Sequence, residues 1–565
     1  MFHVVQGTAG CALSLHWGKS LATSSRRTPQ GRKAARVCGC SGATRIACPF
    51  FMPCNGLTFV PRKSDMSTKH RPITKLLVAN RGEIALRVLR TAREMGLATV
   101  AVYSEADAHA PFVRAADESV CVGPAPSNES YLIVDNIVAA AQETGADAIH
   151  PGYGFLSENA LFAEAVEAAG IRFVGPHPHA IRVMGSKLAA KEAVAARNIP
   201  MVPGTEGAVS DPTQAQQEAE RIGFPLLIKA SAGGGGKGMR AVHDPALLES
   251  ELQRAISEAE RSFGDGAVFI ERLVQQPRHI EIQVLCDSHG NGVHLFEREC
   301  SIQRRHQKVV EEAPSALLDP SLREAMGQCA IEVAKACDYV GAGTVEFLVD
   351  ASREFFFLEM NTRLQVEHPV TEMITGVDLV REQIRIAEGH PLSFQQEDLE
   401  IQGHAIELRV YAEDVAGGFL PSTGTLTRYA PPEGPGIRVD DGVEEGGEVS
   451  MHYDPMLAKL CAYGPTREAA IERMLRAIEE YEVHGVDTTL DFGHFAIDHE
   501  AFRSGEFDTG FVGQHFAPEK LERPLPCDDD TAADLILGAL DRVHAQSLPT
   551  TEAPQGLHPW RMRAR

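Results

Sequence analysis

Residues 75–104 read KLLVANRGEIALRVLRTAREMGLATVAVYS, and this stretch decides the fold class. It opens with an apolar run, 75–80, that is typical of a buried strand. Apolar residues then recur at helical spacing over 84–95, and Gly96 ends that pattern. A second run rich in β-branched residues follows at 99–104. A strand, a helix and a strand in this order predict a parallel, doubly wound α/β sheet.

The same alternation continues along the chain and predicts the domain organisation. A helix at 137–144 and a strand at 147–150 extend the first pattern, and apolar strand candidates recur further on, for example at 354–358. We expect a first α/β domain at 73–186, a second at 187–385 and a third, of mixed strands and helix, at 386–516. We place 1–72 outside the fold as a leader, and 517–565 as a linker-like tail with a short helix at 532–543.

The composition excludes two classes of protein. The chain has 565 residues, of which 44% are hydrophobic, and contains no run of 18 or more apolar residues, so we expect no membrane span. The net charge is −23, and the acidic residues begin only at Asp65. A body of this sign would repel phosphate backbones, which argues against a nucleic-acid-binding protein.

The first 64 residues differ from the rest because they contain Lys and Arg but no Asp or Glu. This is typical of an organellar transit peptide. Alternatively the segment is dispensable upstream sequence and Met66 is the start, which we favour because no sustained amphipathic helix is present. The cysteines after Met66 are scattered without a C-x-x-C pair, which favours a reducing compartment.

A glycine-rich segment predicts phosphate binding. Residues 229–240 read KASAGGGGKGMR and follow directly on an apolar strand. Glycines let backbone N–H groups approach phosphate oxygens closely, and the neighbouring Lys229, Lys237 and Arg240 add positive charge. The segment is not a Walker loop, because Gly238 stands where that motif has Ser or Thr.

Polar residues alternate along 359–367, which reads EMNTRLQVE. In an extended chain these side chains share one face, and a buried row of this kind is too costly unless something binds there. Oxygen atoms of Glu346, Glu359 and Asn361 are hard ligands suited to Mg²⁺ bridging nucleotide phosphates. The alternative is a solvated edge strand, which the apolar residues before Glu359 disfavour.

Five stretches together resemble biotin carboxylase of the ATP-grasp superfamily, over about 73–516. The first is ANRGEIALR at 79–87, the second is HPGYGFLSEN at 150–159 and the third is the glycine-rich segment; the others are RRHQK at 304–308 and EMNTRLQVEHPVTE at 359–372. The resemblance implies a pre-ATP-grasp domain, an ATP-grasp domain with a mobile lid at about 203–275, and a biotin carboxylase C-terminal domain.

The resemblance also implies a role for each matching residue. Positions that would contact the nucleotide are Lys187, Lys229, Gly235, Gly236, His279 and His306, with Glu271, Arg272, Leu273 and Val274 as the hinge that meets adenine. The Mg²⁺ (or Mn²⁺) ligands would be Glu346, Glu359 and Asn361, and the bicarbonate pocket Lys308, Arg363, Gln365 and Val366. Glu367 would be the general base, Arg409 would steady the biotin enolate, and Gln303 and Tyr153 would make further cofactor contacts.

The activity that follows is the ATP- and bicarbonate-dependent carboxylation of biotin through carboxyphosphate. No Met-Lys-Met biotinylation tripeptide is present, so we expect a separate biotin carboxyl carrier protein and carboxyltransferase subunits. The family resemblance implies a homodimer. We favour acetyl-CoA as the final acceptor, ahead of another acyl-CoA, and a cytoplasmic location unless 1–65 is a transit peptide. The alternatives are a subunit of pyruvate carboxylase, another ATP-grasp ligase and a non-catalytic nucleotide-binding regulator.

Overall fold

The computed structural model describes residues 71–205, 207–209, 211–230, 239–264, 266–305 and 307–518, together with Leu521, Leu537 and Leu540. Nearly all of the predicted leader and tail therefore lie outside the described residues, as does the glycine-rich segment from 231 to 238. Three predicted site residues also lie outside the described residues: Gly235, Gly236 and His306.

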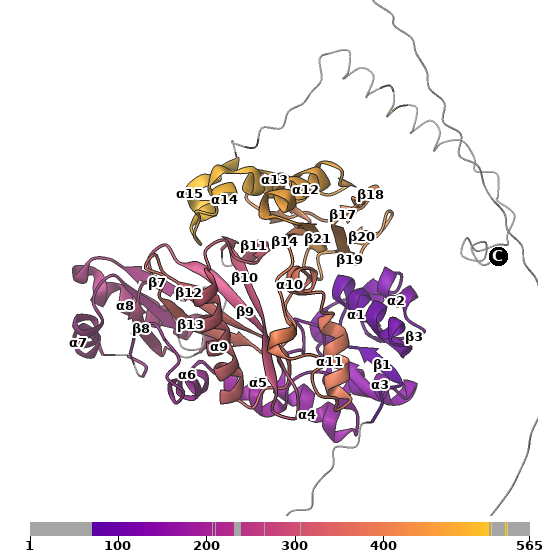
Figure 1. The fold of residues 1–565 in the computed structure, drawn as a ribbon, viewed down its shortest axis with the longest axis horizontal. Helices are drawn as coiled ribbons and strands as arrows, with labels where there is room; N and C mark the ends of the chain where they lie inside the picture. The colour runs from indigo at the N-terminus through magenta and orange to yellow at the C-terminus, as the bar shows by residue number, and fades with distance from the viewer. Residues whose placement is uncertain are drawn as a thin grey trace, which may run out of the picture. The chain divides into compact units, whose positions relative to one another are not determined.

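A five-stranded parallel sheet forms the N-terminal part of the described chain (Figure 1). Its strand order is β3-β2-β1-β4-β5. All neighbouring strands are parallel, and the chain adds strands first on one side of β1 and then on the other, which confirms the doubly wound prediction. The strands are β1 (Lys75–Val78), β2 (Ala98–Ser104), β3 (Glu118–Gly123), β4 (Ala148–His150) and β5 (Arg172–Phe173). The helices are α1 (Gly82–Glu94), α2 (Pro111–Ala115), α3 (Val134–Thr144), α4 (Ala160–Ala168) and α5 (Pro178–Gly185).

Helix α1 forms as its apolar spacing predicts. Ile84, Val88 and Leu89 are buried on one side, where they pack in a core with the sheet residues Leu76 and Val78. The helix ends just before Gly96, whose φ of +78° lies in the left-handed region that glycine adopts without strain.

An eight-stranded antiparallel sheet carries the middle of the chain, in the order β13-β12-β9-β10-β11-β14-β21-β19. Its last three strands come from the region predicted as the third domain, so the sheet runs without a break past the expected boundary at 385/386. The strands are β9 (Arg278–Cys286), β10 (Gly292–Arg304), β11 (Gln307–Ala313), β12 (Gly341–Val349), β13 (Phe355–Asn361), β14 (His404–Tyr411), β19 (Ile437–Asp441) and β21 (Met456–Gly464).

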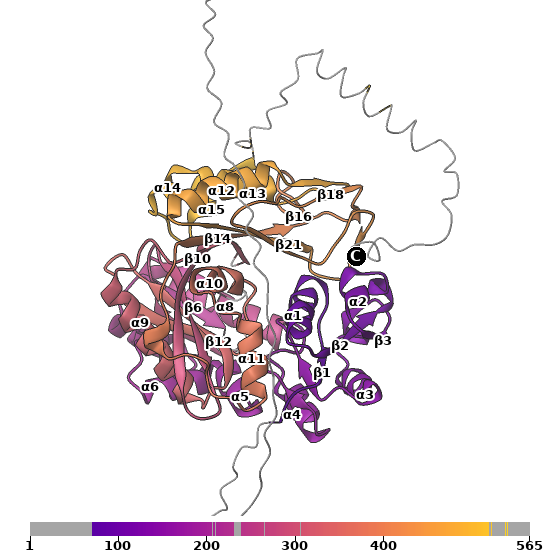
Figure 2. The ribbon, with the colours of Figure 1, turned by 45° about the vertical axis from the view of Figure 1, so that its right-hand side comes forward.

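Helices cover this sheet at both ends. Helix α12 packs on β14 and β21, in a core that includes Met474, Leu408 and Leu460, and both views place the α12–α15 layer over these strands (Figures 1 and 2). The helices are α6 (Lys187–Ala195), α9 (Pro320–Ala336), α10 (His368–Thr375), α11 (Leu379–Ala387), α12 (Arg467–Glu479), α13 (Leu490–Asp498), α14 (Glu500–Ser504) and α15 (Phe511–His515). Among the described residues, no helix combines the length and the apolar character needed to cross a membrane.

Short strand pairs and a small sheet complete the described structure. The pairs are β15 (Glu413–Asp414) with β16 (Leu420–Pro421), β17 (Gly424–Thr425) with β20 (Glu448–Val449), and β18 (Arg428–Ala430) with β22 (Glu482–His484). The small sheet, β7-β6-β8, has its own core with two helices and lies within the predicted lid. Its elements are α7 (Pro212–Ile222), β6 (Leu226–Ala230), β7 (Met239–Val242), α8 (Leu248–Phe263) and β8 (Val268–Arg272). Mobility of this unit stays a prediction.

The prediction that 359–367 is one extended strand is wrong after Asn361. Strand β13 ends at Asn361, and Glu367 is the N-cap of α10. The chain leaves the sheet because the Thr362 N–H donates to the Glu158 side chain at 3.0 Å, and because Leu364 is fully buried in the core beneath α1. Only the first two polar residues of the row therefore lie on the strand.

Arg298 joins four elements of the structure from inside the sheet. Its guanidinium donates to Glu281 at 2.5 Å and to Gln283 at 2.8 Å on β9, and to Thr344 on β12 and Thr371 on α10 at 2.9 Å each. The Arg298 side chain is 0% exposed. Because its charge is buried together with that of Glu281, neither partner is replaceable by itself.

We expect Arg298→Leu to lower the free energy of unfolding by about 3–5 kcal/mol, because it leaves the Glu281 carboxylate buried beside an apolar group. The matched control is Arg353→Leu, which removes a surface pair with Asp319 and should cost less than about 1 kcal/mol. Urea denaturation followed by circular dichroism measures both. Equal midpoints for the two variants would contradict the assignment of Arg298 as the structural connection.

Candidate active site

Lys308 lies among three buried carboxylates that come from different elements. Its Nζ is 2.5 Å from Glu281 Oε2 on β9, 2.9 Å from Glu346 Oε1 on β12 and 2.7 Å from Glu367 Oε1 at the start of α10. The Lys308 side chain is itself only 11% exposed. One ammonium therefore offsets the mutual repulsion of three anions in a place where water is largely excluded.

The charges in this cluster are reflected in its pKa values. Burial by itself would lower the pKa of Lys308, but Glu281, Glu346 and Glu367 raise it well above its ordinary value. Burial would likewise raise the pKa of Glu367, yet Lys308 and Arg409 hold it well below its ordinary value. The ligand-free protein consequently keeps Glu367 ionised, with both of its oxygens paired to cations.

Arg409 extends the cluster along β14. Its Nη2 donates to Glu367 Oε2 at 2.9 Å, and its Nε donates to Glu311 Oε1 on β11 at 2.6 Å. Glu367 thus bridges Lys308 on one side and Arg409 on the other. The structure brings these three sequence-predicted residues into direct contact, although 59 and 42 positions separate Glu367 from the two cations.

Glu346 and Glu359 are direct cross-strand neighbours on β12 and β13. The Glu346 carboxylate is the largest cause that raises the pKa of Glu359. Asn361 Nδ2 donates to Glu346 Oε1 at 2.8 Å, which places an amide beside the same pair. Two mutually repelling carboxylates with an amide oxygen form a donor set that fits a hard divalent cation such as Mg²⁺.

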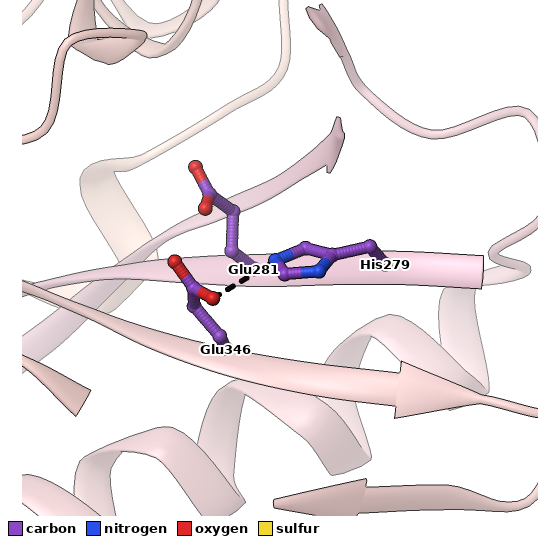
Figure 3. A group of neighbouring side chains, drawn as sticks. All are labelled: His279, Glu281 and Glu346. Carbon is purple, nitrogen blue, oxygen red and sulfur yellow. Dashed lines mark ion pairs between the residues drawn. The ribbon is translucent and has the colours of Figure 1, made fainter. Parts of the chain in front are cut away.

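Figure 3 shows the other side of Glu346, where His279 and Glu281 project from β9. His279 Nε2 is 3.0 Å from Glu346 Oε2. Ligand atoms of His279, Glu281 and Glu346 all lie within 4.8 Å of one another, which is close enough for a shared cation. Because Lys308 already pairs with both carboxylates of this group, the strand β12–β13 side of Glu346 is the better position for a metal.

Arg363 and Gln365 remain close to the strand although the chain has turned. Arg363 Nη2 donates to Asn361 Oδ1 at 3.0 Å, and its Nε is 2.7 Å from the Glu158 carboxylate. Gln365 Nε2 lies 3.3 Å from Glu346 Oε1. The Val366 carbonyl accepts from Lys459 at 3.1 Å, so its direction is fixed as well. The turn therefore gathers the polar side chains that the sequence had placed on one strand face.

A second concentration of cations surrounds Glu271 on β8. Lys229 Nζ and Lys191 Nζ are each 2.6 Å from the Glu271 carboxylate. Burial lowers the pKa of Lys187, and the nearby charge of Lys229 lowers it further. Arg272 adds a guanidinium over the Phe356 ring, 5.3 Å from its centroid, and Leu273 and Val274 follow it. Lysines placed this close to one another favour the binding of an anion.

Gln303 and Tyr153, the two further cofactor contacts that the resemblance implied, differ from each other in their hydrogen bonding. Gln303 Nε2 donates to the Cys300 carbonyl at 2.8 Å, and Gln303 pairs with Lys308 across β10 and β11. The Tyr153 hydroxyl is buried without a hydrogen-bond partner among the described residues, with Lys459 Nζ 6.0 Å from its ring centroid.

Sequence reasoning missed four contributors to the site. Glu158, Glu281 and Glu311 hold the cations, and Lys191 shares Glu271 with Lys229. Lys191 had a usable signal, since it lies four residues after Lys187 and so on the same face of a helix. Glu158 lies within the 150–159 stretch that carries part of the resemblance, although its own role was not predicted. Glu281 and Glu311 had no signal, because each joins the site through a contact between distant parts of the chain.

We expect Lys308→Met to lower the free energy of unfolding by about 3–5 kcal/mol near neutral pH, because buried carboxylates lose their counter-ion. In the wild type, the pKa of Glu367 is lowered, so its contribution to stability is present above its ordinary pKa of 4.5 and is lost as the pH falls. Without Lys308, burial dominates and protonation becomes favourable.

The difference in Tm between the wild type and Lys308→Met should therefore be largest near neutral pH and should narrow towards pH 5, as thermal denaturation measures. Lys335→Met, which removes a surface pair with Glu332, is the control and should show little change at any pH. A constant difference from neutral pH to acid would show that Lys308 does not govern the ionisation of Glu367.

Comparison with known protein families accounts for nearly all of the described chain. Residues 72–181 match the family described as "Biotin carboxylase, N-terminal domain" and residues 407–514 the "Biotin carboxylase C-terminal domain". Residues 186–395 match the "Carbamoyl-phosphate synthase L chain, ATP binding domain".

Curated relatives and solved structures agree with this match. A propionyl-CoA carboxylase alpha chain of Ruegeria pomeroyi is 55% identical over 83% of this chain and 72% of its own length. A biotin carboxylase of Bacillus subtilis is 51% identical over 78% of this chain and 98% of its own.

The crystal structure of a biotin carboxylase complex from Campylobacter jejuni superposes with a TM-score of 0.75 at 46% identity, covering 78% of this chain and 99% of that one. A biotin carboxylase domain dimer from Hydrogenobacter thermophilus, solved with MgADP and bicarbonate, gives 0.75 at 47% identity over 79% and 98%. The chain belongs to the biotin carboxylase family, the ATP-grasp ligases that carboxylate biotin.

Proposed function

We propose that this chain transfers a carboxyl group from bicarbonate to biotin on a separate carrier protein, at the expense of ATP and through carboxyphosphate. The supporting observation is that charged side chains in contact or in cross-strand register follow one another through the site without a gap. This row begins at the Glu346–Glu359 pair, passes through Lys308 and Glu367 and ends at Arg409. Three substrates that must meet in sequence would each find a suitable group along this row.

The phosphate groups of ATP belong at one end of the row in this proposal. Lys187, Lys229 and His279 would contact the nucleotide, and Glu271 to Val274 would meet its adenine. Glu346, Glu359 and Asn361 would hold Mg²⁺, which when bound supplies positive charge to the phosphoryl group being transferred. Mn²⁺ would suit the same oxygen donors. The predicted contacts from Gly235, Gly236 and His306 lie outside the described residues.

Bicarbonate would enter between Arg363 and Lys308, beside Gln365 and the Val366 backbone. Its arrival draws Lys308 towards a new anion, which weakens the hold of Lys308 on Glu367. The pKa of that carboxylate then rises towards the range where a general base works well, and Glu367 accepts the bicarbonate proton. The freed oxygen attacks the γ-phosphoryl group of ATP, and ADP leaves.

Carboxyphosphate is labile, so the site must exclude water while it lasts. The small sheet within 203–275 would close over the nucleotide for this purpose. Carboxyphosphate releases CO₂ next to biotin, and the phosphate takes the biotin N–H proton. Arg409 would stabilise the enolate that results, and Tyr153 would make a further cofactor contact.

The partners and acceptor follow from the relatives rather than from the site. We propose that the chain works as a homodimer in the cytoplasm with a biotin carboxyl carrier protein and carboxyltransferase subunits of an acyl-CoA carboxylase. Acetyl-CoA stays our first acceptor, and the 55% identity to a propionyl-CoA carboxylase chain supports propionyl-CoA beside it. Solved biotin carboxylase structures of a pyruvate carboxylase and a 2-oxoglutarate carboxylase are each 47% identical, so a pyruvate carboxylase stays the alternative assignment.

We expect Glu367→Gln to lower bicarbonate-dependent ATP hydrolysis by at least about 100-fold, because the amide does not accept the bicarbonate proton. ATP affinity, measured by calorimetry, should stay within about threefold, since Glu367 contacts none of the proposed nucleotide ligands. Arg409→Met is the comparison variant. It should retain bicarbonate-dependent ATP hydrolysis far better than carboxylation of free biotin, and equal losses in both assays would remove Arg409 from the biotin role.

An avidin blot of the purified chain should be blank if biotin is carried elsewhere. Adding a separate biotinylated carrier should raise the incorporation of labelled bicarbonate well above that with free biotin, because docking supplies a high effective concentration. With matching carboxyltransferases supplied, the label should pass to acetyl-CoA or propionyl-CoA and not to pyruvate. An avidin band on this chain, or transfer to pyruvate alone, would contradict the proposed partners.

A further inference from the structure

Two glutamates that no sequence argument singled out lie side by side behind Arg409. Glu311 on β11 and Glu407 on β14 are direct partners in the antiparallel register. Side chains at such positions share a face of the sheet, with Cβ atoms about 5 Å apart. Both residues are 0% exposed. A buried pair of like-charged groups at this spacing needs an explanation, because two ionised carboxylates would repel strongly there.

Each of the two carboxyl groups has one oxygen that accepts a hydrogen bond and one that does not. Glu311 Oε1 accepts from Arg409 Nε at 2.6 Å, and Glu407 Oε2 accepts from the Cys461 thiol at 3.4 Å. Glu311 Oε2 and Glu407 Oε1 are both buried without a hydrogen-bond partner in the described structure. A single proton placed between these two oxygens would satisfy both at once.

The surrounding charges decide which of the two holds that proton. Burial raises the pKa of Glu407 well above its ordinary value, and burial raises the pKa of Glu311 to about 7 although Arg409 opposes the shift. Glu311 has a guanidinium as its direct partner, whereas Glu407 has only a weak thiol donor. Charged groups that act on Glu407 are Lys459, Glu311, Arg409 and Glu367; those that act on Glu311 are Arg409, Glu367 and Lys308. The anion is therefore favoured on Glu311 and the proton on Glu407.

We propose that Glu407 is a positioning residue: it stays protonated, donates to Glu311, and thereby keeps Glu311 as the anionic partner that fixes Arg409. With its Nε held by Glu311, the guanidinium keeps its Nη2 on Glu367, while its Nη1 donates to the Tyr411 hydroxyl at 3.5 Å. This inference rests on the proposed biotin-contacting role of Arg409. Glu407 itself would touch neither substrate nor nucleotide.

The direct test is infrared spectroscopy of the ligand-free protein at neutral pH. Burial raises the pKa of Glu83 to about 7, so this carboxyl group contributes to the same spectral region. The difference spectrum of wild type minus Glu407→Gln should therefore contain the C=O stretch of one protonated carboxyl group, shifted in D₂O. The control is Glu312→Gln on β11, because pairing with His404 and Arg467 lowers the pKa of Glu312 to about 2 and keeps it ionised. That control should leave the band unchanged. Absence of a protonated C=O band from the difference spectrum of wild type minus Glu407→Gln would overturn the proposal.

Activity gives a second readout with two variants. Glu407→Gln carries an amide that donates to Glu311 as the protonated carboxyl does, so biotin carboxylation should stay within about threefold of wild type. Glu407→Leu removes the donor, raises the pKa of Glu311 and should reduce biotin carboxylation about tenfold at neutral pH. The pH profile of biotin carboxylation by Glu407→Leu should shift to higher pH, since alkali ionises Glu311 again. A loss in the Gln variant as large as in the Leu variant, or an unshifted Leu profile, would refute the positioning role.

A failure of the proposed function and a failure of the inference on Glu407 would give different experimental results. Absence of bicarbonate-dependent ATP hydrolysis in the wild type would overturn the proposed function, while the infrared experiment needs no substrate and still decides the protonation of Glu407. If Glu407→Leu does not fold, as circular dichroism would show, the Gln variant and its infrared spectrum alone decide between the outcomes.

Discussion

The ammonium of Lys308 is the interaction on which the site depends. Three carboxylates that are almost fully buried converge on it from β9, β12 and the start of α10. Without a cation at their centre these anions would not remain ionised in so dry a place. Arg298 and Arg409 supply the remaining positive charge, and Glu367 reaches two of the three cations directly. Buried pairs of this kind add little net stability, but removing one partner is costly because it leaves an uncompensated buried charge.

The antiparallel sheet explains why such a cluster can be built. Lys308 and Glu311 lie on β11, Arg409 follows on β14, and β9 and β12 add the carboxylates from the other side. Directly paired residues of neighbouring strands share a face of the sheet, as Glu311 and Glu407 do. Near Lys308 the register between β10 and β11 is shifted, which interrupts the simple alternation of faces there. The sheet continues past the predicted boundary at 385/386, which places Arg409 in register with residues that precede it by about a hundred positions.

Local sequence was sufficient wherever a regular period decided the structure. The doubly wound sheet followed from apolar runs around an amphipathic helix, and the five strands are parallel as expected. The polar row that begins at Glu359 was predicted wrongly because its alternation is that of a strand. The point where the chain leaves the sheet depends instead on a contact with Glu158 and on the burial of Leu364. Glu281 and Glu311 escaped notice for the same reason. Their roles exist only through pairing across the sheet, and nothing near them in sequence marks it.

A common principle connects both ends of the site. Its cations are already matched with carboxylates of the protein: Glu271 holds Lys229 and Lys191, Glu158 holds Arg363, and Glu367 holds Lys308 and Arg409. An anionic substrate must therefore displace a side chain that is present before it arrives. Displacement weakens binding, because only the difference between two ion pairs is gained. In return the displaced carboxylate becomes more basic at the moment when a proton must be removed, since its counter-ion has turned to the substrate. In the proposed mechanism, this exchange would convert Glu367 from a firmly ionised structural group into a base only when bicarbonate is in place.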